Sequence, residues 1–87
     1  MWQVVNNSGF IGLSYYEDNE LVIGLRMDEE RNWNSYVFKG RDVWTRYYKD
    51  LDQAIMDCIV FANDWGITLG QNVFNWSDVK RCLLDKR

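Results

Sequence analysis

Residues 43–66 read VWTRYYKDLDQAIMDCIVFANDWG, and this stretch contains the change from strand to helix that decides the fold. In its second half, apolar residues recur every three or four positions, which places them on one face of an α-helix. They are Leu51, Ala54, Ile55, Cys58, Ile59, Ala62 and Trp65. Asp50 with Gln53 three residues later is a capping-box pattern, and Gly66 favours a helix end. The sequence therefore predicts a helix over residues 51–65.

The first half of the same stretch has the alternation of a β-strand. Successive side chains of a strand point to opposite faces. One face would carry Val43, Thr45 and Tyr47, and the other Trp44, Arg46 and Tyr48. Aromatic rings on both faces are expected when one face meets a helix and the other stays partly solvated. We expect this strand to form an edge of the fold.

Further strands are predicted towards the N-terminus. Branched and aromatic residues bounded by turn residues favour strands over residues 2–5, 10–16, 21–27 and 35–39. Gly12 and Gly24 lie inside two of these strands, where glycine indicates a bulge or the close approach of another backbone.

Towards the C-terminus, residues 67–74 form a connection with room for a short strand, and a short last helix follows. Asn75 or Ser77 would cap this helix, whose apolar positions are Val79, Cys82 and Leu83. The order of elements predicts one α+β domain over residues 1–87. Its architecture would be an antiparallel β-meander of four to five strands, with one long helix packed on a face and a short C-terminal helix.

Composition limits the location and the partners of such a domain. No apolar run approaches the roughly 20 residues of a membrane span, and the N-terminus lacks the basic start of a signal peptide, so we expect a cytoplasmic protein. A net charge of −3 argues against binding nucleic acid or anionic lipid through the overall field. The charges nevertheless form blocks, with bases concentrated in residues 31–49 and 79–87 and acids elsewhere.

Groups that perform catalysis are scarce. The chain has no histidine, the usual side chain for proton exchange near neutral pH. Cys58 and Cys82 alone cannot hold a structural zinc ion, and whether they pair with each other stays open. The carboxylates of 17–20 and 28–30 fall in predicted tips and loops, where we expect them to be solvated with ordinary pKa values. We therefore expect no catalytic residue, no metal and no cofactor.

The acidic residues supply the first candidate site. Asp50, Asp57 and Asp64 recur every seven residues along one edge of the predicted helix, and Met56 and Val60 lie beside them, away from its apolar face. Exposed Met and Val among carboxylates are typical of a contact patch for a basic, partly apolar partner. The expected partner-binding residues are Glu17, Asp18, Glu20, Asp28, Glu29, Glu30, Met56, Asp57, Val60 and Asp64.

The basic and aromatic strip over residues 39–49 supplies an alternative site. Rings that stack bases beside cations that meet phosphates are typical of single-stranded nucleic-acid binding. Its residues would be Arg41, Trp44, Arg46 and Tyr48. A third alternative, an assembly subunit, would form a homo-oligomer, and a homodimer stays open under every reading.

The stretch WTRYYKDLDQAI, residues 44–55, resembles a layout found in small phage and mobile-element proteins, in which a short meander is followed by a helix. The size, acidity and lack of catalytic groups are similar to those of anti-CRISPR and anti-restriction inhibitors, a set that shares no single motif. The resemblance implies a non-catalytic inhibitor in the cytoplasm of a host bacterial cell. It would cover a basic surface of a nucleic-acid-handling defence complex, and the resemblance assigns no residue a role.

Overall fold

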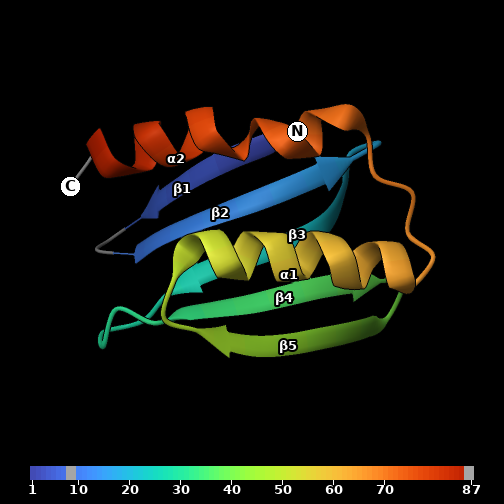
Figure 1. The fold of residues 1–87 in the computed structure, drawn as a ribbon, viewed down its shortest axis with the longest axis horizontal. Helices are drawn as coiled ribbons and strands as arrows, with labels where there is room; N and C mark the ends of the chain where they lie inside the picture. The colour runs from blue at the N-terminus through green and yellow to red at the C-terminus, as the bar shows by residue number, and fades with distance from the viewer. Residues whose placement is uncertain (8–9, 86–87) are drawn as a thin grey trace.

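The computed structural model of the chain describes residues 1–7 and 10–85. Its elements follow the predicted order, with five strands and two α-helices joined by a 3-10 turn (Figure 1). They are β1 (Trp2–Asn7), β2 (Phe10–Glu17), β3 (Glu20–Met27), β4 (Trp33–Lys39), β5 (Asp42–Tyr48), α1 (Leu51–Asp64), η1 (Gln71–Asn75) and α2 (Trp76–Asp85). The predicted α+β class is confirmed. Residues 67–74 contain no strand but the start of η1, and α2 follows η1 directly.

The five strands form one antiparallel sheet in chain order, so β1 and β5 are its two edges. Both helices lie on the same face, α1 over β3 to β5 and α2 over β1 (Figure 1). The sheet therefore has a helix-covered face and a second face that no described helix covers. We call the second one the open face.

Tight turns hold the strands in register. Asp18 and Asn19 both have positive φ, as a two-residue type I′ hairpin turn requires, and they set Glu17 opposite Glu20. Gly40, with φ +60°, is the first residue of the two-residue turn between β4 and β5. Because a slip of one residue would exchange the two faces, these turns decide which side chains meet the helices.

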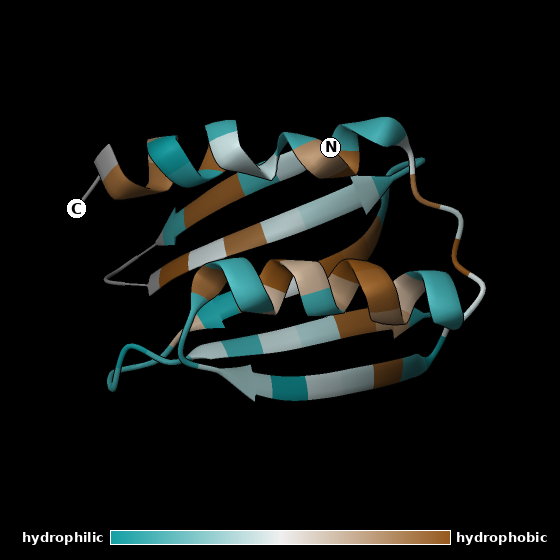
Figure 2. Ribbon diagram, viewed as in Figure 1, coloured by the Kyte–Doolittle hydropathy of each residue, from teal (hydrophilic) through white to brown (hydrophobic). Residues whose placement is uncertain are grey.

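The core lies between the sheet and the helices. One row of it crosses all five strands, because the register places Trp2, Tyr15, Ile23, Val37 and Trp44 side by side. The first four of these are buried, and they meet the apolar side of α1 and the buried side chains of η1 and α2. Figure 2 shows the hydrophobic and hydrophilic residues that make each helix two-sided.

The predicted cap of α1 is confirmed in part. The Asp50 carboxylate accepts a hydrogen bond from the Gln53 backbone N–H at 3.2 Å and caps the helix. The Gln53 side chain does not complete a capping box, because it donates instead to Asp57 Oδ1 at 2.7 Å. The helix ends at Asp64, one residue earlier than expected, and Gly66 follows with φ +82°.

Gly12 and Gly24, the two glycines inside strands, differ in the space that each leaves for a side chain. A Cβ on Gly12 would lie 2.8 Å from the Leu25 carbonyl oxygen, so the predicted close approach of a backbone is confirmed there. A Cβ on Gly24 would meet only side chains, the nearest being Phe38 at 3.5 Å. The bulge lies elsewhere, between Tyr15 and Tyr16.

Candidate binding surfaces

The outward side of α1 carries apolar and acidic residues together. Met56 is 42% exposed and Val60 is 53% exposed, and Asp64 lies one turn beyond Val60. Figure 2 views α1 from this side and shows hydrophobic residues next to hydrophilic ones along it. The expectation that Met56 and Val60 face away from the core is confirmed, because helical spacing turns them opposite the buried residues of α1.

A groove of about 240 Å³ runs between β5 and α1. It exists because α1 lies mainly over β4, which leaves the helix-facing side chains of β5 beside the helix rather than beneath it. The residues that line this β5–α1 groove are Trp44, Arg46, Tyr48, Asp57, Val60, Phe61 and Asp64. The structure thus brings the helix part of the acidic site together with the strand part of the alternative site.

Side chains of the groove are already engaged with one another. The Trp44 ring stacks on Phe61 with centroids 4.2 Å apart, and the Arg46 guanidinium lies 5.7 Å from the Trp44 ring centre. Burial, followed by a hydrogen bond to Asp57, raises the pKa of Tyr48 to about 12. Arg41, the remaining residue of the alternative site, is exposed in the turn before β5. A nucleobase would have to displace Phe61 to reach that face of Trp44.

The hairpin tip, residues 17–20, is not uniformly solvated. Glu17 accepts hydrogen bonds from the Tyr15 hydroxyl at 2.5 Å and from the Gly70 N–H at 2.9 Å. The bond from Tyr15, followed by the one from Gly70, lowers the pKa of Glu17. The expectation of an ordinary, solvated carboxylate is therefore wrong for Glu17, because the segment before η1 packs against the tip from far along the chain. Asp18 and Glu20 are exposed.

The turn over residues 28–32 also uses one of its acids internally. Asp28 Oδ1 accepts the backbone N–H groups of Glu30 at 3.0 Å and Asn32 at 2.9 Å, which closes the turn. The expectation of a freely solvated carboxylate is wrong for Asp28 as well. Glu29 and Glu30 are exposed.

The ten residues of the acidic site do not form one surface. The hairpin tip and the 28–32 turn lie at opposite ends of β3, which is eight residues long. A strand of that length spans roughly 25 Å. The helix residues Met56, Asp57, Val60 and Asp64 form a separate group on α1, and they are the members that lie together with apolar side chains.

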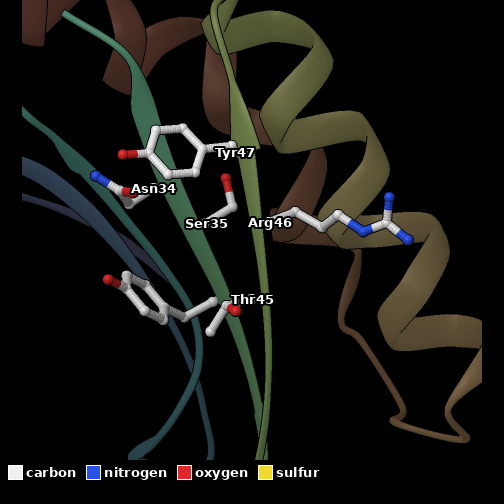
Figure 3. Close-up of a pocket in the computed structure, with 6 residues that line it drawn as sticks. Asn34, Ser35, Thr45, Arg46 and Tyr47 are labelled. Carbon is white, nitrogen blue, oxygen red and sulfur yellow. The ribbon is translucent and has the colours of Figure 1, made fainter. Parts of the chain in front are cut away.

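The open face is a surface that the sequence analysis did not single out. A groove of about 170 Å³ crosses it over Gly12 and Gly24, beside Tyr36. A neighbouring hollow of about 310 Å³ is lined by Tyr36, Thr45 and Tyr47 among others, and Figure 3 shows Tyr47 and Arg46 pointing to opposite sides of the sheet. The alternation of aromatic residues in both β4 and β5 was the signal that could have identified this face.

Of the second basic block the structure describes Lys80 and Arg81, which lie on α2 over β1, whereas β5 with Arg46 forms the opposite edge of the sheet. Lys86 and Arg87 lie outside the described residues. Lys80 forms an ion pair with Asp52 of α1. Cys58 is buried and Cys82 exposed, and both are free thiols. Burial raises the pKa of the Cys58 thiol to about 12.

Within residues 1–7 and 10–85, no three His, Cys, Asp or Glu side chains are placed to hold a metal ion together. Neither of the described α-helices is long and apolar enough to cross a membrane.

Comparison of the chain with protein-family models, with curated proteins and with solved structures gives no match.

Proposed function

We propose that this chain is a non-catalytic binding protein that covers a basic surface of a nucleic-acid-handling protein. More specifically, we propose that it is a phage or mobile-element protein that inhibits a host defence complex in the bacterial cytoplasm. Like an anti-CRISPR protein, it would act by blocking the surface that binds nucleic acid. The observation that carries it is the exposure of Met56 and Val60 on α1 beside Asp57 and Asp64.

The composition of this patch supports a protein partner. Carboxylates steer a basic partner and fix its orientation, whereas exposed apolar side chains supply area that becomes buried on contact. Methionine in particular adapts to the shape of what it meets. An acidic domain bound in this way would exclude nucleic acid by occupying the same surface.

Among the described residues, the five groups whose pKa values are shifted are poor candidates for acid–base catalysis. Tyr15, Tyr47, Tyr48 and Cys58 have raised pKa values, and Glu17 has a lowered one. Each shift moves the group away from neutral pH, whereas a general acid or base works best with a pKa near the operating pH.

The alternative, a module that binds single-stranded nucleic acid through Arg41, Trp44, Arg46 and Tyr48, receives less support. Asp57 and Asp64 share the β5–α1 groove with the last three of these residues, and carboxylates repel phosphates. Stacking of Trp44 on Phe61 further reduces the ring area open to a base.

The proposal is tested by capture from a bacterial lysate on the immobilised chain, followed by elution with a single-stranded oligonucleotide. We expect capture of a nucleic-acid-binding protein that the oligonucleotide competes away, and loss of capture with Asp64→Lys. Asp78→Lys is the matched control, because Asp78 is exposed on α2, outside the patch. Asp57 is a poorer target since Gln53 and Tyr48 bond to it.

Equal loss with Asp64→Lys and Asp78→Lys would indicate a general charge effect and would refute the patch. Direct binding of the oligonucleotide by the chain, weakening steeply with salt, would favour the alternative function instead.

A further inference from the structure

The outer edge of β5 has no partner among the described residues. β5 pairs only with β4, and in Figure 1 it forms the border of the sheet with no element beyond it. Native edge strands are usually shortened, bulged, or guarded by proline or charged side chains, especially lysine. β5 is seven residues long, has no proline or lysine, and keeps an unbroken register with β4. Its charged residues are Asp42 at the first position and Arg46, whose guanidinium lies near the Trp44 ring.

The turn before β5 decides which backbone groups point outward. In a two-residue hairpin the residues that flank the turn exchange hydrogen bonds, here Lys39 and Asp42, and hydrogen-bonded and non-bonded pairs then alternate. The even-numbered residues of β5 therefore direct their N–H and C=O groups to β4. Val43, Thr45 and Tyr47 direct theirs to the free edge, where they form a row of open donors and acceptors.

Exposed apolar and cationic side chains flank this edge on both faces of the sheet. On the open face, Val43 is 51% exposed and Tyr47 is 66% exposed. On the helix-covered face, Trp44 and Arg46 lie at the mouth of the β5–α1 groove, with the guanidinium near the indole ring.

We propose that two copies of this chain pair through β5, antiparallel about a twofold axis at Thr45, so that their sheets become continuous. This register overlaps the whole strand, from Asp42 to Tyr48. It makes the outward residues into three hydrogen-bonded pairs, and each such pair exchanges two bonds. It also sets Val43 opposite the second copy's Tyr47.

The side chains of β5 are self-complementary in this register. On the helix-covered face Trp44 lies opposite the second copy's Arg46, a pairing in which a cation meets an aromatic ring. A shift of the axis by one residue to Arg46 would instead place the two guanidinium groups opposite each other. The chemistry of the edge therefore fits a second copy of the same strand, and a foreign strand is the competing occupant that the test excludes.

Pairing would also complete the β5–α1 groove. Because α1 lies mainly over β4, the two α1 helices of the pair would be separated by three strand spacings, about 14 Å. The second copy would then supply the missing wall of the groove with its own Asp57, Val60 and Asp64. The pairing does not depend on the proposed function.

Sedimentation velocity of the purified chain over a range of concentrations tests the pairing. We expect a reversible equilibrium between the 10.4 kDa chain and its dimer. Val43→Lys with Tyr47→Lys in one chain sets like charges opposite each other and should abolish the dimer, and Val43→Glu with Tyr47→Glu should do the same. An equimolar mixture of the two variants should restore it as a heterodimer, because each introduced ammonium group then faces an introduced carboxylate across the strand pair.

The matched control is Gln3→Lys with Val5→Lys, which places the same two charges on exposed positions of β1 and should leave the dimer intact. Thermal unfolding checks that each variant is folded. If the double variants do not fold, Thr45→Pro replaces them, because it removes only an outward N–H that bonds to no strand of the same chain.

A wild-type chain that stays monomeric throughout would overturn the proposal, and would leave the free edge to a foreign strand. So would a dimer that survives both the double lysine variant and Thr45→Pro, or a mixture of the charged variants that does not associate.

Discussion

The two edges of the sheet are built differently. At β1 the edge is held by buried contacts with distant parts of the chain: Trp2 Nε1 donates to the Val73 carbonyl at 2.6 Å, and α2 lies along the strand (Figure 1). At β5 the contacts with α1 are half-exposed and the outer side of the strand is uncovered. Both are edge strands, yet the face of β1 is packed beneath the C-terminal segment, whereas β5 is only partly covered by α1.

The difference separates structural from binding groups. Both edge strands carry aromatic residues, but Trp2 of β1 is buried against η1 and α2, whereas Trp44 and Tyr48 of β5 line a groove with Asp57, Val60 and Asp64. α2 covers the helix-facing side of β1, and the described residues hold no further element to cover β5. We infer that changes at β1 act on stability and changes at β5 act on association.

The largest expected effect compares the two edge tryptophans. Trp2→Ala should lower the free energy of unfolding by about 3 to 5 kcal/mol, because it leaves a cavity and an unsatisfied carbonyl. Trp44→Ala should cost about 1 to 2 kcal/mol, since the ring is half-buried and loses mainly its stacking on Phe61. Chemical denaturation measures both, and equal losses would remove the distinction between the edges.

The tyrosine hydroxyls give a closer comparison, because each contacts a carboxylate. Tyr15 is fully buried and its hydroxyl lies 2.5 Å from Glu17 Oε2 and 2.8 Å from Asn72 Oδ1. Tyr15→Phe should cost about 1 to 3 kcal/mol, because it leaves these groups without their partner. Tyr48→Phe should cost about 0.5 to 1.5 kcal/mol, because water can replace its bond to Asp57. A larger loss for Tyr48→Phe in urea denaturation would contradict this ranking.

Glu17 and Tyr15, which are bonded to each other, make the stability of the fold depend on pH. The pKa of Glu17 is lowered in the folded chain, so its contribution is complete above the ordinary glutamate pKa of about 4.3 and is lost as pH falls through the folded value. Burial raises the pKa of Tyr15 to about 12, so its contribution is complete below about pH 10 and is lost as pH rises towards 12.

Unfolding of the wild type and of Glu17→Gln across acidic pH checks the first of these statements. The stability difference between the two proteins should shrink as the pH falls through the acidic range. A difference independent of pH would show that the Glu17 carboxylate does not contribute in its charged form.

The smallest expected effects concern two ion pairs of the described residues. Lys80 and Asp52 are 31% and 45% exposed and connect α2 to α1, whereas Arg81 and Asp78 are 74% and 75% exposed within α2. Asp52→Asn should lower the free energy of unfolding by less than about 1 kcal/mol, and Asp78→Asn should have no measurable effect. Thermal unfolding at low and high salt checks both, because only the first should show a salt-sensitive loss.

Local patterns explain how much of the fold was predictable. The spacing from Leu51 to Ala62, with Asp50 before it, was enough to place α1, because helix periodicity and capping act within a few residues. Branched and aromatic residues between turn residues placed four strands and alternation placed β5, although β4 begins at Trp33 rather than Ser35. The sequence did not predict the 3-10 turn η1 before α2, because its conformation depends on packing of Val73 beneath Trp2.

The candidate site was less predictable. Exposure of Met56 and Val60 followed from helical spacing alone, but the engagement of Glu17 and Asp28 did not. Glu17 is bonded to Gly70, 53 residues away, and no local pattern connects those positions. Alternating aromatic residues in β4 and β5 indicated a second, partly solvated face, but that the helices leave it uncovered depends on both of them packing on one side of the sheet.

By itself the sequence determined the α+β class, the capped helix, the alternation of β5 and the acidic, apolar character of the outward side of α1. These properties arise between near neighbours, whose geometry the backbone dictates. Tertiary structure alone decided that the C-terminal segment packs over β1 and that β5 stays half-covered beside a groove. Such pairings join residues far apart in the chain, and their choice depends on which surfaces can be buried together.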